Sequence, residues 1–247
     1  MPPRAPSPVG VVLADKPPGP SSFAIVSALR RTTGARTGHT GTLDPFASGL
    51  LLLLSGLATR LAPCFVGLDK RYLTELDLTR TTSTGDSEGE PGDEHEPLQA
   101  GALEAALERL RGEVELPIPA ASAVRIGGER AYRLARRGVE VTMPLRRSQV
   151  YELELLASEP GRVTLALRVS SGTYVRALAT ALGGHCVSLR RTAVGPFRLE
   201  EADPERIVPA ALALARLEPA ALARVPEAVR ARVLDFETQL AGDGEAA

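Results

Sequence analysis

The stretch GHTGTLDPFASGLL, residues 38–51, continues without a break into a run of leucines that ends at Ser55. The leucine run predicts a buried strand. Residues 38–44 contain two glycines, two threonines, a histidine and Asp44, which predicts a polar turn at the edge of the core. Asp-Pro pairs are common in turns, where the carboxylate accepts hydrogen bonds from nearby backbone N–H groups. At this point the sequence therefore allows two roles for Asp44, one structural in the turn and one catalytic.

The composition is typical of a folded chain with a sizeable core. The chain has 247 residues, of which 44% are hydrophobic, enough for one large domain or for one domain with a small appendage. No apolar run approaches the length of a membrane span, and the first residues lack the apolar region of a secretory signal. We therefore expect a cytoplasmic protein with no membrane contact. Cys64 and Cys186 lie among apolar neighbours, which predicts reduced, buried thiols.

The charge is nearly balanced in total but unevenly distributed. The formal net charge is −1, yet residues 81–115 are strongly acidic and residues 116–200 are basic. Within the basic part, residues 124–147 carry seven arginines and two glutamates. Such a segment is typical of a surface that follows a phosphate backbone, and it is equally typical of a solvated helix face.

Hydrophobic periodicity and turn signals predict a mixture of strands and scattered helices. A strand ends near Lys16, and Ser21 or Ser22 caps a helix that stops at Gly34. Further strands are expected at 50–55, 70–79, 149–158, 162–171 and 186–194, and further helices at 101–111 and 174–184. Strands 149–158 and 162–171 form a hairpin, and residues 80–97 form an acidic, flexible loop. With no βαβ repeat, the pattern predicts an α+β fold around a mixed, largely antiparallel sheet flanked by helices.

The composition changes after residue 205. Residues 206–247 are rich in Ala, Leu, Arg and Glu, which predicts short helices broken at Pro219 and Pro226, with a disordered tail from Ala241. We therefore divide the chain into a catalytic domain, 1–205, and a helical C-terminal segment, 206–247.

Several kinds of chemistry lack a signal in this sequence. His39, His95 and His185 form no close pair with one another or with the cysteines, so we expect no metal site. The chain has no P-loop, no dinucleotide-binding glycine fingerprint and no G-x-S-x-G motif, so we expect no cofactor.

A carboxylate, an arginine and two tyrosines remain as candidates: Asp44, Arg176, Tyr72 and Tyr174. An arginine beside Asp44 would lower the pKa of its carboxyl and keep it ionised. The tyrosine rings could stack on a nucleic-acid base.

Six stretches, in order, resemble motifs of the TruB family of tRNA pseudouridine synthases. One of them, GHTGTLDPFASGLL (38–51), is similar to the catalytic motif of that family. The others are DKPPGPSS (15–22), KRY (70–72), TSTGDSEG (82–89), GTYVRAL (172–178) and SLRRTAVGPF (188–197). The resemblance implies a pseudouridine synthase fold over residues 9 to about 200. Many family members continue into a small RNA-binding β-domain called PUA, and we expect this domain to be absent or reduced to a remnant here.

The resemblance also implies roles for individual residues. They are Asp44 as the essential carboxylate, Tyr72 on the target base and in proton transfer, Arg176 paired with Asp44, His39 near the flipped nucleotide, Tyr174 and Leu189 lining the uracil pocket, and Lys16 supporting the motif turn. Packing explains the tyrosines and Leu189 equally well, and Lys16 would serve as a simple turn cap. The chain departs from the family pattern at LPIPAASAVR (116–125), where Leu116 stands for the usual Gln, Ile118 for a proline, Ala121 for Tyr and Arg125 for Lys.

The implied reaction isomerises uridine 55 in the T-loop of tRNA to pseudouridine. The enzyme flips the base out of its stack, breaks the bond from N1 to C1′ and rejoins the base through C5, with no cofactor. We expect a monomer that binds the T-arm stem-loop. Two other classes fit parts of the sequence: a non-catalytic RNA-binding module using the basic segment, and a metal-dependent nuclease using Asp44, Asp86 and Glu88.

Overall fold

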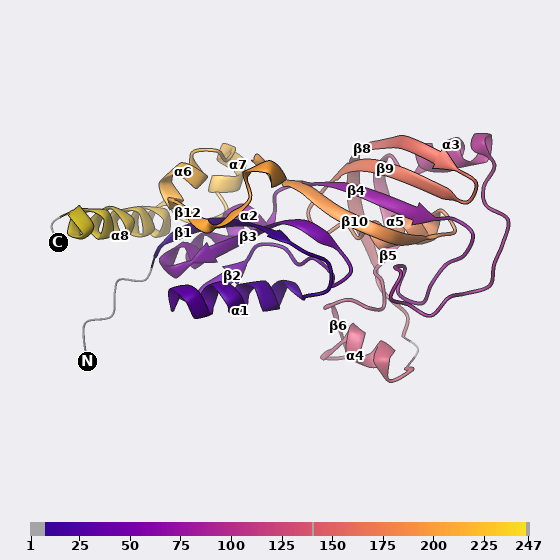
Figure 1. Cartoon of the computed structure of the whole chain (residues 1–247), viewed down its shortest axis with the longest axis horizontal. Coiled ribbons are helices and arrows are strands. Elements are labelled where there is room, and N and C mark those ends of the chain that lie inside the picture. The colour runs from indigo at the N-terminus through magenta and orange to yellow at the C-terminus, as the bar shows by residue number, and fades with distance from the viewer. Residues whose placement is uncertain (1–7, 140, 246–247) are drawn as a thin grey trace. The chain divides into compact units, whose positions relative to one another are not determined.

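The computed structural model describes residues 8–139 and 141–245, which divide into two compact units (Figure 1). Unit 1 contains the chain up to Lys70 and from Arg191 onward, and unit 2 contains Arg71–Arg190. The domain boundary that we predicted at residue 205 lies inside unit 1.

Unit 1 is built on three antiparallel strands in the order β12-β1-β3, with β2 paired to β3. Their bounds are β1 Gly10–Lys16, β2 Thr37–His39, β3 Ser48–Ser55 and β12 Asp203–Val208. Strand β1 pairs with β3 along its whole length, from Gly10 opposite Ser55 to Lys16 opposite Gly49. This register brings Lys16 to the start of β3, beside the turn that carries Asp44.

The leucine run of β3 is buried on both faces of the sheet. Leu50, Leu52 and Leu54 join a core cluster with C-terminal residues such as Ala213, because side chains alternate between the two faces of a strand. Leu51 and Leu53 point to the other face, where they join a cluster with Val26 of helix α1. Two covered faces explain why this strand is apolar throughout, without alternation.

Helix α1, Ser22–Thr33, has the caps that the sequence predicts. The Oγ of Ser21 accepts a hydrogen bond from the backbone N–H of Ala24 at 3.2 Å, which makes Ser21 the N-cap. Gly34 ends the helix with φ at +65°, the left-handed conformation that glycine adopts without strain. The sequence prediction of this helix is confirmed.

The C-terminal segment folds into helices α6 Ala210–Leu214, α7 Pro219–Leu222 and α8 Glu227–Glu245 (Figure 1). Helix α6 contacts both β1 and α8. The predicted breaks at Pro219 and Pro226 are confirmed. The predicted disordered tail from Ala241 is wrong for residues 241–245, which continue α8, because extending a formed helix costs little. Residues 246–247 of that prediction lie outside the described chain.

Unit 2 carries a sheet in the order β10-β4-β9-β8-β5, in which β8 is antiparallel to both β9 and β5. The strands are β4 Lys70–Asp77, β5 Gly112–Pro117, β8 Leu145–Glu159, β9 Arg162–Val169 and β10 His185–Val194. The helices of this unit include α3 Ala100–Arg109 and α5 Val175–Ala181. Strands β8 and β9 form the predicted hairpin. Strand β4 begins in unit 1 and continues into unit 2, and β10 begins in unit 2 and ends in unit 1, because the boundaries fall at residues 70 and 191.

Small elements complete both units. Unit 1 also has the 3₁₀ turns η1 Gly56–Leu61 and η2 Leu199–Glu201, the short helix α2 Ala62–Val66 and strand β11 Phe197–Arg198, which pairs with the end of β10. In unit 2 the arginine-rich segment forms the two-residue strands β6 Arg125–Ile126 and β7 Glu129–Arg130, followed by helix α4 Ala131–Arg136. The fold class is the predicted one: helices flank a largely antiparallel sheet.

Candidate active site

Residues 40–47, which we call the motif loop, connect the antiparallel strands β2 and β3 and carry Asp44. The strands fix both ends of the loop, since His39 pairs with Leu53 and the backbone N–H of Thr40 donates to the carbonyl of Leu52 at 3.1 Å. Inside the loop, the N–H of Ala47 donates to the carbonyl of Asp44 at 3.2 Å. The remaining carbonyls need partners from elsewhere in unit 1.

Lys16 supplies several of these partners. Its side chain is fully buried, and Nζ donates to the carbonyl of Ala47 at 2.6 Å, to that of Pro45 at 3.2 Å and to that of Pro17 at 2.8 Å. The N–H of Gly19 also donates to Pro45, at 2.8 Å. A buried ammonium is stable only when its donors are satisfied. Lys16 therefore binds the backbone of the turn that follows Asp44.

Ser22 holds the residue on the other side of Asp44. Its buried hydroxyl donates to the carbonyl of Leu43 at 2.8 Å and accepts from the N–H of Leu43 at 2.8 Å. The first turn of α1 is thus bonded directly to the residue before Asp44. Our sequence analysis missed this contact, because it assigned the Ser-Ser pair to a helix cap and to a family motif without identifying Leu43 as a partner.

His39 lies at the entry to the motif loop and is half-buried. Burial lowers the pKa of its imidazole, and the nearby Arg191 guanidinium lowers that pKa further. The ring is therefore neutral at physiological pH. Its Nδ1 is buried and has no hydrogen-bond partner within the described chain.

Arg176, in unit 2, is the first polar residue of helix α5 and is buried. Its Nη1 donates to the carbonyl of Thr84 at 2.6 Å and lies 3.3 Å from Oδ2 of Asp86, while Nη2 donates to the carbonyl of Ala121 at 3.0 Å. Asp86 is buried too, and its Oδ1 accepts from the Thr84 hydroxyl at 2.6 Å. The segment around Asp86 is therefore folded against α5.

This arrangement corrects our expectation that residues 80–97 form a flexible acidic loop. Isolated bridges join Thr82 to Pro91 and Asp86 to Cys186 within unit 2. Gly85, at φ +73°, turns the chain where an added Cβ would lie 3.2 Å from the Cβ of Arg176. One buried ion pair and this close approach order the segment despite its acidic composition.

The chain that carries these residues matches a model of a known protein family. The model described as the N-terminal domain of the TruB family of pseudouridylate synthases matches residues 30–175, which include the motif loop and Asp86 and end one residue before Arg176. The chain belongs to the TruB family. Its relatives include the tRNA pseudouridine synthase B of Arthrobacter sp. strain FB24, 40% identical over 78% of this chain and 68% of that protein. The protein of the same name from Geobacillus kaustophilus is 42% identical, over 78% and 73%.

Solved structures of other proteins contain chains with a similar fold. The crystal structure of a Cbf5-Nop10-Gar1 complex contains a chain that is 29% identical, with a TM-score of 0.59. The aligned part covers 76% of this chain and 50% of that one. The chain therefore spans about half the length of that solved chain. An H/ACA ribonucleoprotein bound to a substrate RNA containing 2′-deoxyuridine has a chain of the same fold, with a TM-score of 0.56 at 23% identity.

The other TruB motif residues occupy defined places within each unit. Tyr72 is half-buried on β4, Leu189 is buried on β10, and Tyr174 stands at the N-cap position of α5. Tyr174 lines a small hollow with Arg146 and Leu116, the residue that replaces the usual family Gln. The predicted pairing of Arg176 with Asp44 joins residues of different units and stays a prediction.

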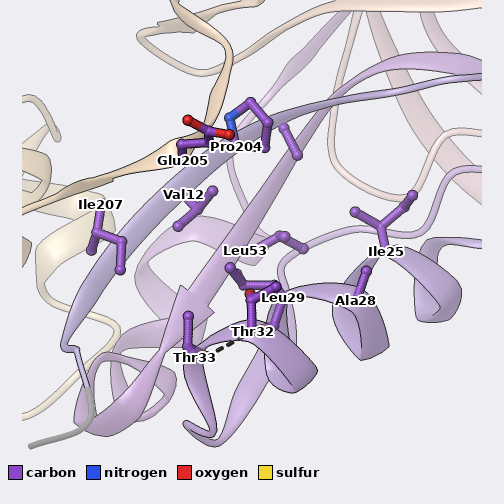
Figure 2. Close-up of a pocket in the computed structure, with 11 residues that line it drawn as sticks. Val12, Ile25, Ala28, Leu29, Thr32, Thr33, Leu53, Pro204, Glu205 and Ile207 are labelled. Atoms are coloured by element: carbon purple, nitrogen blue, oxygen red, sulfur yellow. Dashed lines mark hydrogen bonds between the residues drawn. The ribbon is translucent and has the colours of Figure 1, made fainter. Parts of the chain in front are cut away.

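A separate apolar pocket of about 510 Å³ lies in unit 1, between α1 and β12 (Figure 2). Val12 and Leu53 of the sheet, Ile25 and Leu29 of α1, and Ile207 of β12 are among its lining residues. Its one acidic lining residue is the exposed Glu205, and it includes no residue of the motif loop. We assign it no part in the reaction.

The described residues contain no group of three or more His, Cys, Asp or Glu placed to hold a metal ion. None of their helices combines the length and the apolar character needed to cross a membrane.

Proposed function

We propose that the chain converts uridine 55 in the T-loop of tRNA to pseudouridine. Membership of the TruB family and 40–42% identity to proteins named tRNA pseudouridine synthase B support this function. The observation that carries the proposal is the fixed motif loop, in which buried side chains bind the backbone on both sides of Asp44. A turn whose carboxylate served only as a cap would need no such support.

The reaction breaks the bond from uracil N1 to C1′, turns the base and forms the bond from C5 to C1′. No atom or electron is gained overall, since the C5 proton is lost and N1 gains one. Asp44 acts either as a nucleophile or as the anion that stabilises the detached base and sugar. We assign proton transfer to Tyr72, whose hydroxyl can accept and donate a proton.

The target uridine must leave its stack before these atoms can react, at a cost of about a few kcal/mol. We propose that the neutral ring of His39 fills the space that the base leaves and that Tyr72 stacks on the flipped base. Tyr174 and Leu189 would line the uracil pocket. An imidazole without positive charge suits this role, because it can pack against bases with little desolvation cost.

Arg176 would balance the charge of Asp44. The guanidinium has five N–H donors, of which Nη1 binds the carbonyl of Thr84 and lies beside Asp86 while Nη2 binds the carbonyl of Ala121. These bonds also hold Arg176 in one orientation, which pre-organises it for a carboxylate partner.

We further propose that the chain acts in the cytoplasm as a monomer and contacts the T-arm with its arginine-rich segment. Arg125, Arg130 and Arg133 are exposed there. Arg137 is also exposed but forms a two-pronged ion pair with Glu129, at 2.7 and 2.9 Å, so part of the basic charge is neutralised within the protein.

Pseudouridine mapping by carbodiimide chemistry tests the function. Unmodified tRNA and an isolated T stem-loop are incubated with the purified chain in EDTA, and product is mapped by nucleotide. We expect pseudouridine at position 55 in both RNAs, with chain length unchanged. Intact, unmodified RNA with a salt-sensitive gel shift would instead indicate a binding module, and shortening of the RNA that requires Mg²⁺ would indicate a nuclease.

A further inference from the structure

Arg191 of β10 is a large buried side chain in unit 1, at 2% exposure, and it reaches the motif loop. Its Nε donates to the carbonyl of Leu50 at 2.6 Å. Its Nη2 donates to the carbonyl of Gly41 at 3.1 Å, and its Nη1 to that of Thr42 at 3.4 Å. One side chain therefore joins the residues before Asp44 to the strand that follows the loop.

The acceptors explain why a guanidinium occupies this site. Each of its three nitrogens donates to a backbone carbonyl, that of Leu50, Thr42 or Gly41. The planar fork can point at several acceptors at once, whereas a lysine ammonium is a point charge on a flexible stem. Burying a charge in this way is costly, so the contact indicates a requirement beyond filling space.

Gly49 lies directly against the backbone of Arg191. Its φ is +103°, and a Cβ added there would lie 2.3 Å from the carbonyl oxygen and 2.6 Å from the nitrogen of Arg191. Only glycine allows this approach. The backbone position of Arg191, and with it the reach of its side chain, is therefore set by the residue at the start of β3.

The Arg191 contacts complete the support of the loop. Arg191 binds the carbonyls of Gly41 and Thr42, Ser22 binds Leu43, and Lys16 binds Pro45 and Ala47. Two buried cations thus bind the backbone on either side of Asp44. The positive charge of Arg191 also lowers the pKa of His39, the residue just before the motif loop.

We infer that Arg191 is a positioning residue that fixes the backbone of the motif loop so that Asp44 meets the flipped base in a reactive geometry; this role rests on the proposed function. Arg191 need not touch the RNA. A displacement of about 1 Å at a reacting group can lower a rate about 10²-fold, and the loss of the guanidinium fork frees the carbonyls of residues 41, 42 and 50 together.

The test compares Arg191→Lys and Arg191→Gln with the control Arg216→Lys. Arg216 also lies in unit 1 and binds a backbone carbonyl, that of Pro196 at 2.7 Å, together with the carboxylate of Glu201. Within the described residues it makes no hydrogen bond or ion pair with the motif loop. Each protein is assayed for thermal melting, T-arm affinity, single-turnover rate at saturating RNA, and hydrogen exchange of the loop amides. The glutamine variant removes the buried charge and serves if the lysine variant does not fold.

We expect both Arg191 variants to bind the T-arm within about threefold of the unaltered chain while the single-turnover rate falls about 10²-fold and the loop amides exchange faster. Arg216→Lys should lower the melting temperature and leave that rate unchanged. A folded Arg191 variant with the normal rate at saturating RNA would overturn the role. So would an equal rate loss in Arg216→Lys, since that points to general destabilisation. Failure of the unaltered chain to form pseudouridine would instead overturn the proposed function.

Discussion

Ser22 and Leu43 bond to each other in both directions, with the serine hydroxyl donating to the leucine carbonyl and accepting from its N–H, each at 2.8 Å. Ser21, its neighbour, caps helix α1 through Ala24. The two adjacent serines therefore have different roles: Ser21 caps the helix, and Ser22 bonds the helix to Leu43, the residue before Asp44.

Replacing each serine with alanine separates the two duties. Ser22→Ala leaves two buried backbone groups of Leu43 without a partner, so we expect a loss of about 1–3 kcal/mol in the free energy of unfolding and a lower single-turnover rate. Ser21→Ala should cost about 0.5–2 kcal/mol through the lost cap and leave the rate unchanged. Chemical denaturation and single-turnover assays measure both effects. Equal rates for the two variants would show that the Leu43 bonds have no part in catalysis.

Lys70 gives the chain a pH-dependent stability. Its buried ammonium donates to the carbonyls of Val66 and Leu68, yet burial, together with Arg191 and Arg224, lowers its pKa from 10.5 to about 7 against the opposing effect of Asp69. Between these values the unfolded chain holds a proton that the folded chain does not. The free energy of unfolding therefore rises with pH from about 7 to about 10.5, and the penalty is fully present below pH 7.

Denaturation curves across this range test the prediction. Lys70→Met removes the titrating group, and Lys70→Arg stays charged throughout, so both variants should lose the part of the slope that Lys70 contributes. The comparison uses slopes, because the methionine variant also leaves two carbonyls without their donor. Parallel curves for the unaltered chain and both variants would contradict the lowered pKa.

The arginine-rich segment is expected to contact phosphates. Reversal of Arg133, Arg136 and Arg137 to glutamate should weaken T-arm binding and flatten its salt dependence, with little change in turnover at saturating RNA. In a matched pair of single reversals, Arg133→Glu should reduce the salt slope by about 1, whereas Arg232→Glu, on an exposed part of α8, should not change it. If the triple reversal leaves the slope intact, the segment is only a solvated face.

Local signals in the sequence predicted much of this molecule. The Ser21 cap, the Gly34 stop, the β8–β9 hairpin and the breaks at Pro219 and Pro226 depend on neighbouring residues, and each was found as expected. The support of the motif turn by Lys16 was likewise predicted from the motif resemblance, and its hydrogen bonds are present.

The features that escaped prediction depend on partners distant in sequence. Arg191 is separated from Gly41 by 150 positions, and Arg176 from Thr84 by 92. No local pattern marks an arginine whose acceptors are backbone carbonyls. The same distance explains the acidic segment: its composition indicates flexibility, and the buried partner that folds it, Arg176, lies far along the chain.

The central claim is that Asp44 performs the chemistry, and Asp44→Asn tests it most directly. Asparagine keeps the size of the side chain and can still accept hydrogen bonds, but it cannot act as an anionic nucleophile or balance an arginine. Melting, T-arm gel shift and pseudouridine mapping are measured on one preparation of this variant. We predict a folded protein that binds the T-arm and forms no detectable pseudouridine, whereas substantial product from the folded variant would show that Asp44 is a turn residue and contradict the account.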